Sequence, residues 1–231
     1  MIALAQTTQI TSDPPLQLIG RAVFLVSGGI DSPVAASMLI RKGVVPVFAY
    51  FDSYPLCDQA AEGIAITATK RVCTFHRLTN VIFYSIPHSP DLEEIVTKCP
   101  EKFACILSRR LMFRIAEKIG LHENCDAIVT GDAIGQKASQ TLQNITATDC
   151  VMKRLTVLRP LVGMNKLDIE RYAKQIATYE ISIRPGVATC GVPTQNPSTN
   201  ARRVKLEEVE ADLNIPSMVE RAFKNARVIR I

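Results

Sequence analysis

A short turn, Ser27-Gly-Gly-Ile-Asp-Ser32, constrains the fold of this chain more than any other feature. It follows residues 21–26, which read as a buried strand because they are continuously apolar after Arg21. We expect Ser32 to be the N-cap of a helix that begins at Pro33, since serine suits the N-cap and proline suits the first helical position. Glycines let a bound group approach the backbone, and a helix N-terminus offers it unpaired N–H groups and partial positive charge. The turn therefore predicts an anion site, best suited to a phosphate.

Strands and helices alternate along the rest of the chain. The first three strands that we expect, 21–26, 44–51 and 81–85, are continuous apolar runs, as in a parallel sheet covered on both faces. Two more strands are expected at 127–130 and 155–158. Helices are expected at 33–42, 59–76, 91–97, 101–119 (ending at Gly120), 135–145, 165–176, 205–213 and 216–226. This order predicts an α/β fold with a doubly wound parallel sheet, which binds ligands beyond the carboxyl ends of its strands.

The same features suggest a division of the chain. We interpret residues 1–20 as a flexible leader and 21–204 as the nucleotide-binding domain. Residues 184–204 read as a loop within it, rich in Pro, Gly and Asn. We expect residues 205–231, two amphipathic helices and a basic end, to pack on the same domain.

Composition narrows the classes of protein. The net charge of +5 permits a polyanionic partner. The chain contains no run of about 20 apolar residues, so we expect no membrane-spanning segment. The first residues do not resemble a signal peptide, so we expect a cytoplasmic protein whose seven cysteines are mostly reduced. The chain has no Cys-x-x-Cys and no His-x-x-x-His pair, so we expect no structural zinc or other protein-bound metal centre.

The turn differs from the two common phosphate loops, because the chain has neither G-x-x-x-x-G-K-[ST] nor a G-x-G-x-x-G after the first strand. Ser-Gly-Gly-x-Asp-Ser in a strand–turn–helix context resembles the pyrophosphate loop of the N-type ATP pyrophosphatases. The resemblance implies a PP-loop ATPase fold of the adenine nucleotide alpha hydrolase type. It also implies ATP and Mg²⁺ as cofactors and a loop that grips the pyrophosphate leaving group.

Three further segments resemble those of tRNA 4-thiouridine synthetases. They are Gly131-Asp-Ala-Ile-Gly-Gln-Lys-Ala-Ser-Gln-Thr141, Leu158-Arg-Pro-Leu-Val-Gly-Met-Asn-Lys166, and the pair Thr178-Tyr-Glu-Ile-Ser182 and Thr189-Cys-Gly-Val192. Their order and spacing match over residues 21 to about 213. The resemblance implies an ATP-dependent tRNA sulfurtransferase. Such an enzyme adenylates uridine O4, releases pyrophosphate, and then transfers sulfur from a persulfide or sulfide.

The resemblance also implies which residues contact ATP. Beyond the loop residues Ser27, Gly28, Gly29, Asp31 and Ser32, these are Leu25, Val26, Tyr50, Phe51, Arg109, Gly131 and Gln140. Strand ends can read an adenine edge with their backbone, although the same residues also read as plain strand core. Gly131 would keep a side chain out of the ligand's way, or it is an ordinary turn glycine. Gln140 would bond phosphate or ribose, or it lies on a solvated helix face.

Charged residues complete the expected site. Arg109 offers a planar fork of donors to phosphate oxygens, whereas Arg110 and Arg114 read as surface or RNA-facing. Asp31 would hold Mg²⁺ or the loop's own amides, or act as a second helix cap. A basic rim for tRNA phosphates is expected from Lys137, Lys153, Arg154, Arg184, Arg202 and Arg203, each of which also reads as a solvated residue.

The family's sulfur chemistry points to Cys190, in the Cys-Gly-Val segment. The resemblance implies that this thiol takes part in sulfur transfer, either by carrying a persulfide or by resolving one. Cys105 could pair with it across the site, or it is simply packed in a helix. Cys57, in the loop after the second expected strand, is the weakest of the three candidates for sulfur transfer.

Two departures leave alternatives open. Family members usually carry an N-terminal RNA-capturing region with a THUMP domain, and some carry a C-terminal rhodanese domain, whereas about 20 residues precede the first strand here. The expected partners are tRNA, bound alone or with a separate RNA-binding chain, a sulfur donor protein or sulfide, and a second copy in a homodimer. The alternatives are another PP-loop adenylating enzyme that acts on a small molecule, and a noncatalytic nucleotide-binding subunit.

Overall fold

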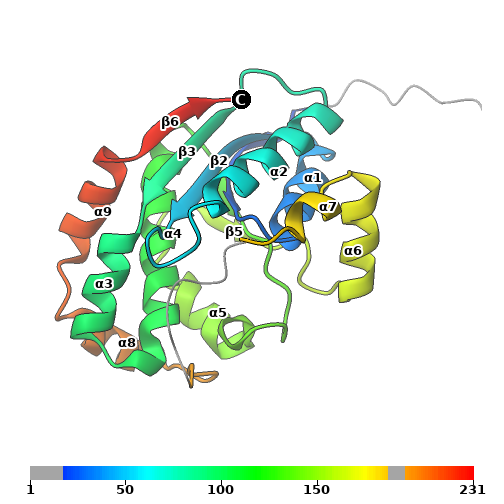
Figure 1. Ribbon diagram of the computed structural model, residues 1–231. Coiled ribbons are helices and arrows are strands. Elements are labelled where there is room, and N and C mark those ends of the chain that lie inside the picture. Colours follow the sequence, from blue (N-terminus) through cyan, green and yellow to red (C-terminus); the bar gives the residue numbers. More distant parts are fainter. Residues whose placement is uncertain (1–17, 187–195) are drawn as a thin grey trace, which may run out of the picture.

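Residues 18–186 and 196–231 are described by a computed structural model, in which six strands form one sheet (Figure 1). The order across the sheet is β5-β4-β1-β2-β3-β6. The first five strands are parallel, and β6 runs antiparallel to β3 at one edge. The strands are β1 (Gly20–Val26), β2 (Val44–Asp52), β3 (Ile82–Pro87), β4 (Ala127–Val129), β5 (Thr156–Leu158) and β6 (Arg227–Arg230).

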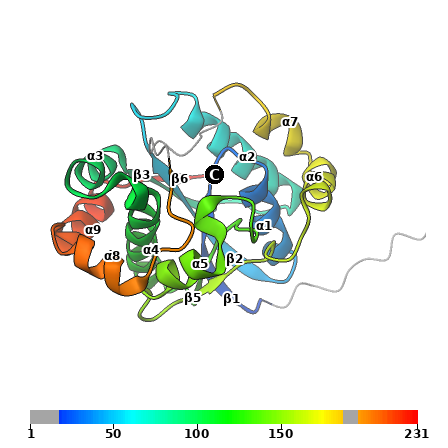
Figure 2. The same cartoon turned by 90° about the horizontal axis from the view of Figure 1, so that it is seen from below.

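Helices cover both faces of this sheet, and both views show the two groups on opposite sides (Figures 1 and 2). One face carries α1 (Asp31–Ile40), α2 (Ala61–Phe75), α6 (Lys166–Gln175) and α7 (Tyr179–Ser182). The other carries α3 (Ser89–Lys98), η1 (Glu101–Phe103), α4 (Ala104–His122), η2 (Ala138–Gln140), α5 (Leu142–Asp149), α8 (Arg203–Glu210) and α9 (Ile215–Lys224). The α/β doubly wound architecture is therefore confirmed. In the described part of the chain, no helix combines the length and apolarity needed to cross a bilayer.

Several expected elements were wrong in detail. The sheet is mixed, because Arg227–Arg230, which read as a basic end, forms the antiparallel strand β6. Helix α4 does not stop at Gly120 but continues to His122. Glycine at position 120 serves close packing rather than helix termination, because a Cβ there would lie 2.5 Å from Leu155 Cδ1. The helix expected at 135–145 is instead the short turn η2 followed by α5.

A buried ion pair ties α8 to the long helix α4. Arg110 is 1% exposed and donates from Nε and Nη2 to the two carboxylate oxygens of Glu210, each at 2.7 Å. Arg114, one turn later, donates to the same oxygens at 2.8 Å. Our assignment of Arg110 and Arg114 to the surface was wrong, because their partner lies about 100 residues away in the chain. This network fixes the C-terminal helices to the domain that carries the site.

We expect Glu210→Gln to lower the free energy of unfolding by about 3–5 kcal/mol, because it leaves Arg110 buried without a counter-charge. Urea denaturation at pH 7 measures the change. Glu207→Gln is the matched control, since Glu207 pairs with Arg203 at an exposed site. It should change stability by less than about 1 kcal/mol. Equal effects of the two substitutions would contradict the account.

The same network predicts how stability depends on pH. Burial raises the pKa of Glu210, but the bonds from Arg110 and Arg114 outweigh burial and bring it from near 4.5 to about 2. Because the folded pKa is depressed, the stabilisation is complete above the unfolded pKa and is lost as pH falls toward 2. The stability difference between wild type and Glu210→Gln should therefore shrink as pH falls from 5 to 2. A constant difference would refute this assignment.

Candidate nucleotide-binding site

The glycine turn after β1 is closed by its own serines. The Ser27 N–H donates to Ser32 Oγ at 2.8 Å, and Ser32 Oγ donates to the Ser27 carbonyl at 3.2 Å. The Gly29 N–H donates to Ser27 Oγ at 3.3 Å. Ser32 is thus not the N-cap that we expected, because α1 begins at Asp31 with Ile30 in the capping position. Ile30 has no polar side chain to cap the helix, which leaves its first-turn N–H groups available to an anion.

Gly131 brings the end of β4 against this turn. A Cβ at Gly131 would lie 2.8 Å from the Ser32 nitrogen and 2.9 Å from both the Asp31 carbonyl carbon and the Ser32 Cα. These are backbone atoms, so they cannot rotate away as a side chain can. We expected a side chain at this position to block the ligand. The structure gives a different reason, since a side chain would push the phosphate turn itself out of place.

The strand ends beside the turn place their side chains in the core. Leu25 and Val26 are aligned with Ala49 and Tyr50 across β1 and β2, at the carboxyl end of both strands. Val26 and Tyr50 belong to the apolar cluster under α1 and α2, whereas Phe51 belongs to the cluster under α4. Their side chains therefore serve packing, and any contact with an adenine would come from backbone atoms. Burial raises the pKa of Tyr50, whose hydroxyl has no hydrogen-bond partner among the described residues.

A buried carboxylate, Asp132, organises the arginines at this edge. It is 4% exposed, and its Oδ2 accepts from Arg109 Nη2 at 2.6 Å and from Arg159 Nε at 3.3 Å. Thr130 Oγ1 donates to the same oxygen at 2.9 Å, and Gln140 Nε2 donates to Oδ1 at 3.3 Å. Burial raises the pKa of Asp132, but the guanidinium of Arg109 and the other donors outweigh it and keep the pKa low. The acid is thus held ionised between two cations.

Sequence reasoning missed Asp132 and Arg159, although both follow strands that end at the site. Arg159 also makes a two-point ion pair with Asp149, at 2.6 and 2.8 Å. Its guanidinium and that of Arg109 lie 6.0 and 5.6 Å from the centre of the Phe113 ring. The available signal was a charged residue within three positions of the carboxyl end of each of these two parallel strands.

Gln140 and Asp31, which we also expected to contact ATP, both lie at this edge of the sheet. Gln140 is 5% exposed, so it does not lie on a solvated helix face. Its Oε1, like Arg109 Nε, is buried and has no partner among the described residues. Asp31 Oδ1 accepts from Lys166 Nζ at 2.7 Å, which brings the last residue of the 158–166 segment to the turn. The structure thus brings Asp31, Arg109 and Gln140 to the carboxyl edge of the sheet, with Gly131 between the strands.

The three cysteines expected to take part in sulfur transfer have different outcomes. Cys190 lies outside the described residues, so its role and its pairing with Cys105 stay predictions. Cys105 is half-buried and packs against the core under α4. Burial, and secondarily Asp52, raise the pKa of Cys57, which argues against a reactive thiolate there.

The expected basic rim is only partly possible. Lys153 and Arg154 precede β5, which places them at the amino edge of the sheet, opposite the site. Their backbone N–H groups donate to Glu117 Oε1 at 2.9 and 2.7 Å. Including them in the rim was therefore wrong. Lys137 follows β4 on the carboxyl side, and Arg202 and Arg203 lie at the start of α8.

Comparison with known proteins decides the family. The family model described as "Thiamine biosynthesis protein (ThiI)" matches residues 18–215. The chain belongs to the ThiI family. It is 37% identical over 228 residues to a protein of Acetivibrio thermocellus named "Probable tRNA sulfurtransferase", covering 98% of this chain and 57% of that protein. It is 39% identical over 218 residues to a protein of the same name from Alkaliphilus metalliredigens, covering 94% of this chain and 55% of that protein. The ThiI-family chain thus spans little more than half the length of the relatives it matches.

Solved structures agree with this assignment. A crystal structure of a 4-thiouridine synthetase–RNA complex with bound ATP superposes with a TM-score of 0.86 at 36% identity, covering 92% of this chain and 55% of that one. An NMN synthetase from Francisella tularensis superposes with a TM-score of 0.51 at 14% identity, over 89% of this chain and 84% of that one. The second likeness shows the fold alone. The family resemblance that the sequence motifs suggested is thereby confirmed, as is the PP-loop ATPase fold.

Gly131→Ala should disable nucleotide binding, because its Cβ would overlap the backbone of the turn. We expect ATP affinity, measured by isothermal titration calorimetry, to fall by at least about tenfold, which corresponds to about 1.4 kcal/mol. Gly63→Ala is the control, since a Cβ built at that α2 position meets no atom within 4 Å apart from its chain neighbours and the backbone of its own helix. Unchanged ATP affinity in a folded Gly131→Ala protein would contradict the site.

Proposed function

We propose that this ThiI-family chain carries out ATP-dependent thiolation of uridine in tRNA, forming 4-thiouridine. The observation that carries the proposal is the serine-closed glycine turn of residues 27–32, held against Gly131 at the carboxyl edge of the sheet. The similarity to a 4-thiouridine synthetase that was crystallised with RNA and ATP supports the substrates. We place this activity in the cytoplasm, where tRNA is modified.

In the proposed reaction, the turn and the N-terminus of α1 hold the pyrophosphate portion of ATP. Uridine O4 attacks the α-phosphorus, the bond to the β-phosphate oxygen breaks, and pyrophosphate leaves. Arg109, which Asp132 fixes in place, would stabilise the charge that develops on the leaving group. O4 then carries an adenylate, so that AMP can depart when sulfur attacks C4.

Asp31 fits the magnesium ion that accompanies ATP. Its carboxylate lies at the turn, and carboxylate and hydroxyl oxygens are hard ligands of the kind that Mg²⁺ prefers. When bound, the ion would offset the negative charge of the phosphates. Lys166, which bonds Asp31 at 2.7 Å, would keep the carboxylate directed toward the turn.

The family resemblance assigns Cys190 to the sulfur-transfer step. A persulfide sulfur attacks C4, the C4–O4 bond breaks, and AMP leaves. A thiolate then attacks the inner sulfur of the adduct, which frees 4-thiouridine and leaves a disulfide between the two cysteines for an external thiol to reduce. We assign the attacking thiolate to Cys190. With sulfide as the donor, no disulfide forms. The identity of the donor, the pairing with Cys105 and a homodimer stay predictions.

Asp31→Asn should lower the rate of AMP formation by about a hundredfold, the typical loss when one electrostatic contact to developing charge is removed. The assay contains ATP, Mg²⁺, unmodified tRNA transcript and sulfide, and AMP and pyrophosphate are quantified. Asp212→Asn, at an exposed position after α8, is the control and should retain the wild-type rate. No tRNA-dependent AMP release by the wild type would sink the proposed function.

Cys190→Ser should separate activation from sulfur transfer. With a persulfide donor, we expect AMP formation to continue while 4-thiouridine, measured by mass spectrometry of digested tRNA, falls to background. Cys73→Ser offers a comparison at a buried thiol on the α1–α2 face, where no role in sulfur chemistry is expected. Normal 4-thiouridine formation by Cys190→Ser would remove this cysteine from the mechanism.

A further inference from the structure

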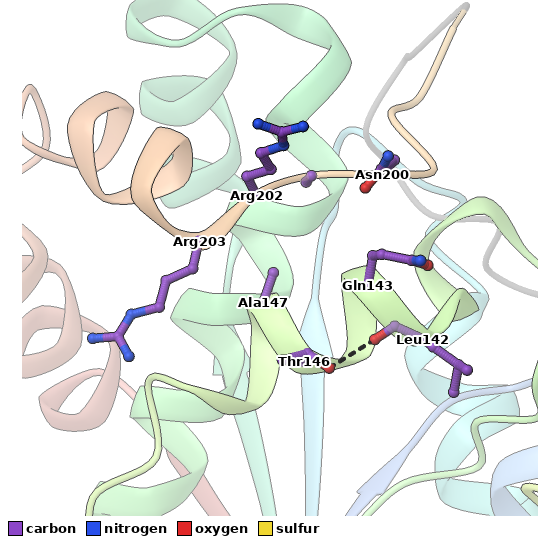
Figure 3. Close-up of a pocket in the computed structure, with 8 residues that line it drawn as sticks. Leu142, Gln143, Thr146, Ala147, Asn200, Arg202 and Arg203 are labelled. Carbon is purple, nitrogen blue, oxygen red and sulfur yellow. Dashed lines mark hydrogen bonds between the residues drawn. The ribbon is translucent and has the colours of Figure 1, made fainter.

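A groove of about 410 Å³ lies next to the nucleotide site, between α5 and the segment 200–203 that leads into α8 (Figure 3). It is separate from the turn after β1, and of its lining residues the sequence pointed only to Arg202 and Arg203, as part of the expected basic rim. Viewed from below, the segment and α5 lie side by side (Figure 2). Its lining consists of Leu142, Gln143, Thr146, Ala147, Asn200, Ala201, Arg202 and Arg203.

Hydrogen bonds hold the two walls of this groove together. Asn144 is completely buried, and its Nδ2 donates to the carbonyls of Ala138 and Ser198, both at 2.7 Å. Its Oδ1 accepts from the Ala201 N–H at 2.9 Å. Thr141 Oγ1, the N-cap hydroxyl of α5, donates to the Thr199 carbonyl at 2.7 Å. The groove is therefore a built feature of the fold rather than a gap between two loosely packed segments.

The buried ion pair between Arg110 and Glu210 also holds the two walls of the groove together. Arg110 donates to the Ala147 carbonyl of α5 and, at 2.7 Å, to Glu210 of α8. One buried guanidinium thus connects the helix on one side of the groove to the helix on the other. Its position sets the distance between them.

The groove has the charge of an anion site. None of the described residues that line it is acidic, and two carry guanidinium groups. Arg203 donates to Glu207 at 2.7 Å, but both side chains are about half exposed, so this pair is weak and can exchange. Arg202 is the N-cap residue of α8 and does not cap the helix with its side chain, which leaves the first-turn N–H groups available to an anion.

The remaining lining suits an unpaired base. The side chain of Leu142 is prominent at the surface, with 63% of the residue exposed. The amides of Gln143 and Asn200 lie at one end of the groove, and the guanidinium of Arg203 lies at the other (Figure 3). Amides can bond base edges, which are accessible in RNA where the bases are unpaired.

We propose that this groove binds single-stranded RNA next to the uridine that enters the nucleotide site. Arg202, Arg203 and the start of α8 would contact backbone phosphates, and Gln143, Asn200 and Leu142 would contact a base. The sequence connection supports this, because α5 begins two residues after Gln140 of the nucleotide site. A strand in the groove would thus extend to within a short reach of the turn. This inference rests on the proposed function, since it names the surface that holds the substrate of that reaction.

Fluorescence anisotropy of a labelled single-stranded oligoribonucleotide, titrated with the full chain without ATP, tests the groove. The double charge reversal Arg202→Glu, Arg203→Glu should weaken binding at least tenfold. It should also reduce the slope of log affinity against log salt by about 1.4, since each neutralised phosphate of a single strand contributes about 0.7. Lys153→Glu, Arg154→Glu makes the same charge change at the opposite edge of the sheet and should leave affinity within about twofold.

A milder variant guards against misfolding. Arg202→Gln combined with Leu142→Ser leaves the Arg203–Glu207 pair intact and should still weaken RNA binding by about threefold or more. Thermal unfolding verifies that each variant is folded. RNA binding by both groove variants equal to wild type, or no RNA binding by the wild-type chain, would overturn the proposal.

Calorimetry with ATP shows whether the groove binds RNA or the nucleotide. It also distinguishes a failure of this inference from a failure of the proposed function. We expect groove variants to bind ATP as the wild type does. If they lost ATP affinity and kept RNA affinity, the groove would belong to the nucleotide and the proposal would be wrong. A wild-type chain that binds RNA through the groove but never forms AMP would refute the proposed function and leave this inference standing.

Discussion

The close approach of two neighbouring strand ends is the constraint on which the site depends. Gly131, just after β4, lies so near the backbone of Asp31 and Ser32 that no side chain fits between them. The serine hydrogen bonds within the turn fix its shape from the other side, with Ser27 and Ser32 bonded to each other's backbone or hydroxyl. Because the turn is held from both directions, its amide groups and the start of α1 stay fixed around one volume. A preorganised cradle of this kind binds an anion without first having to order itself.

Charges at this edge are arranged through residues distant in sequence. Asp132 holds Arg109 and Arg159 together, and Lys166 bonds Asp31 across 135 positions of the chain. Each carboxylate keeps a cation near the expected phosphates while limiting its freedom to move. On the far side of α4, Arg110 makes the corresponding link between α5 and α8. The long helix α4 therefore couples the nucleotide site to the groove, because Arg109 and Arg110 are successive residues that face different sides.

The sequence was informative wherever a local pattern decides the outcome. Continuous apolar runs predicted the parallel strands, and the glycine turn after β1 predicted the position of the site. Features set by distant partners were missed or misread. Arg110 resembles any helical arginine until Glu210 is placed beside it. The Arg227–Arg230 strand has an arginine at each end, as a basic tail can also have, until its pairing with β3 is known. One local feature was misread as well: Ser32 was interpreted as a helix cap because serine is common there, whereas its hydroxyl bonds the backbone of Ser27.

Amide chemical shifts during titration with a non-hydrolysable ATP analogue show whether the turn of residues 27–32 holds the phosphates. We predict saturable shifts that are largest at Gly28, Gly29 and Gly131, with small changes at Gly120, which packs against Leu155 at the opposite edge of the sheet. Shifts that are absent from the turn, or largest elsewhere while the turn stays unchanged, would contradict the claim that residues 27–32 hold the phosphates of a bound nucleotide.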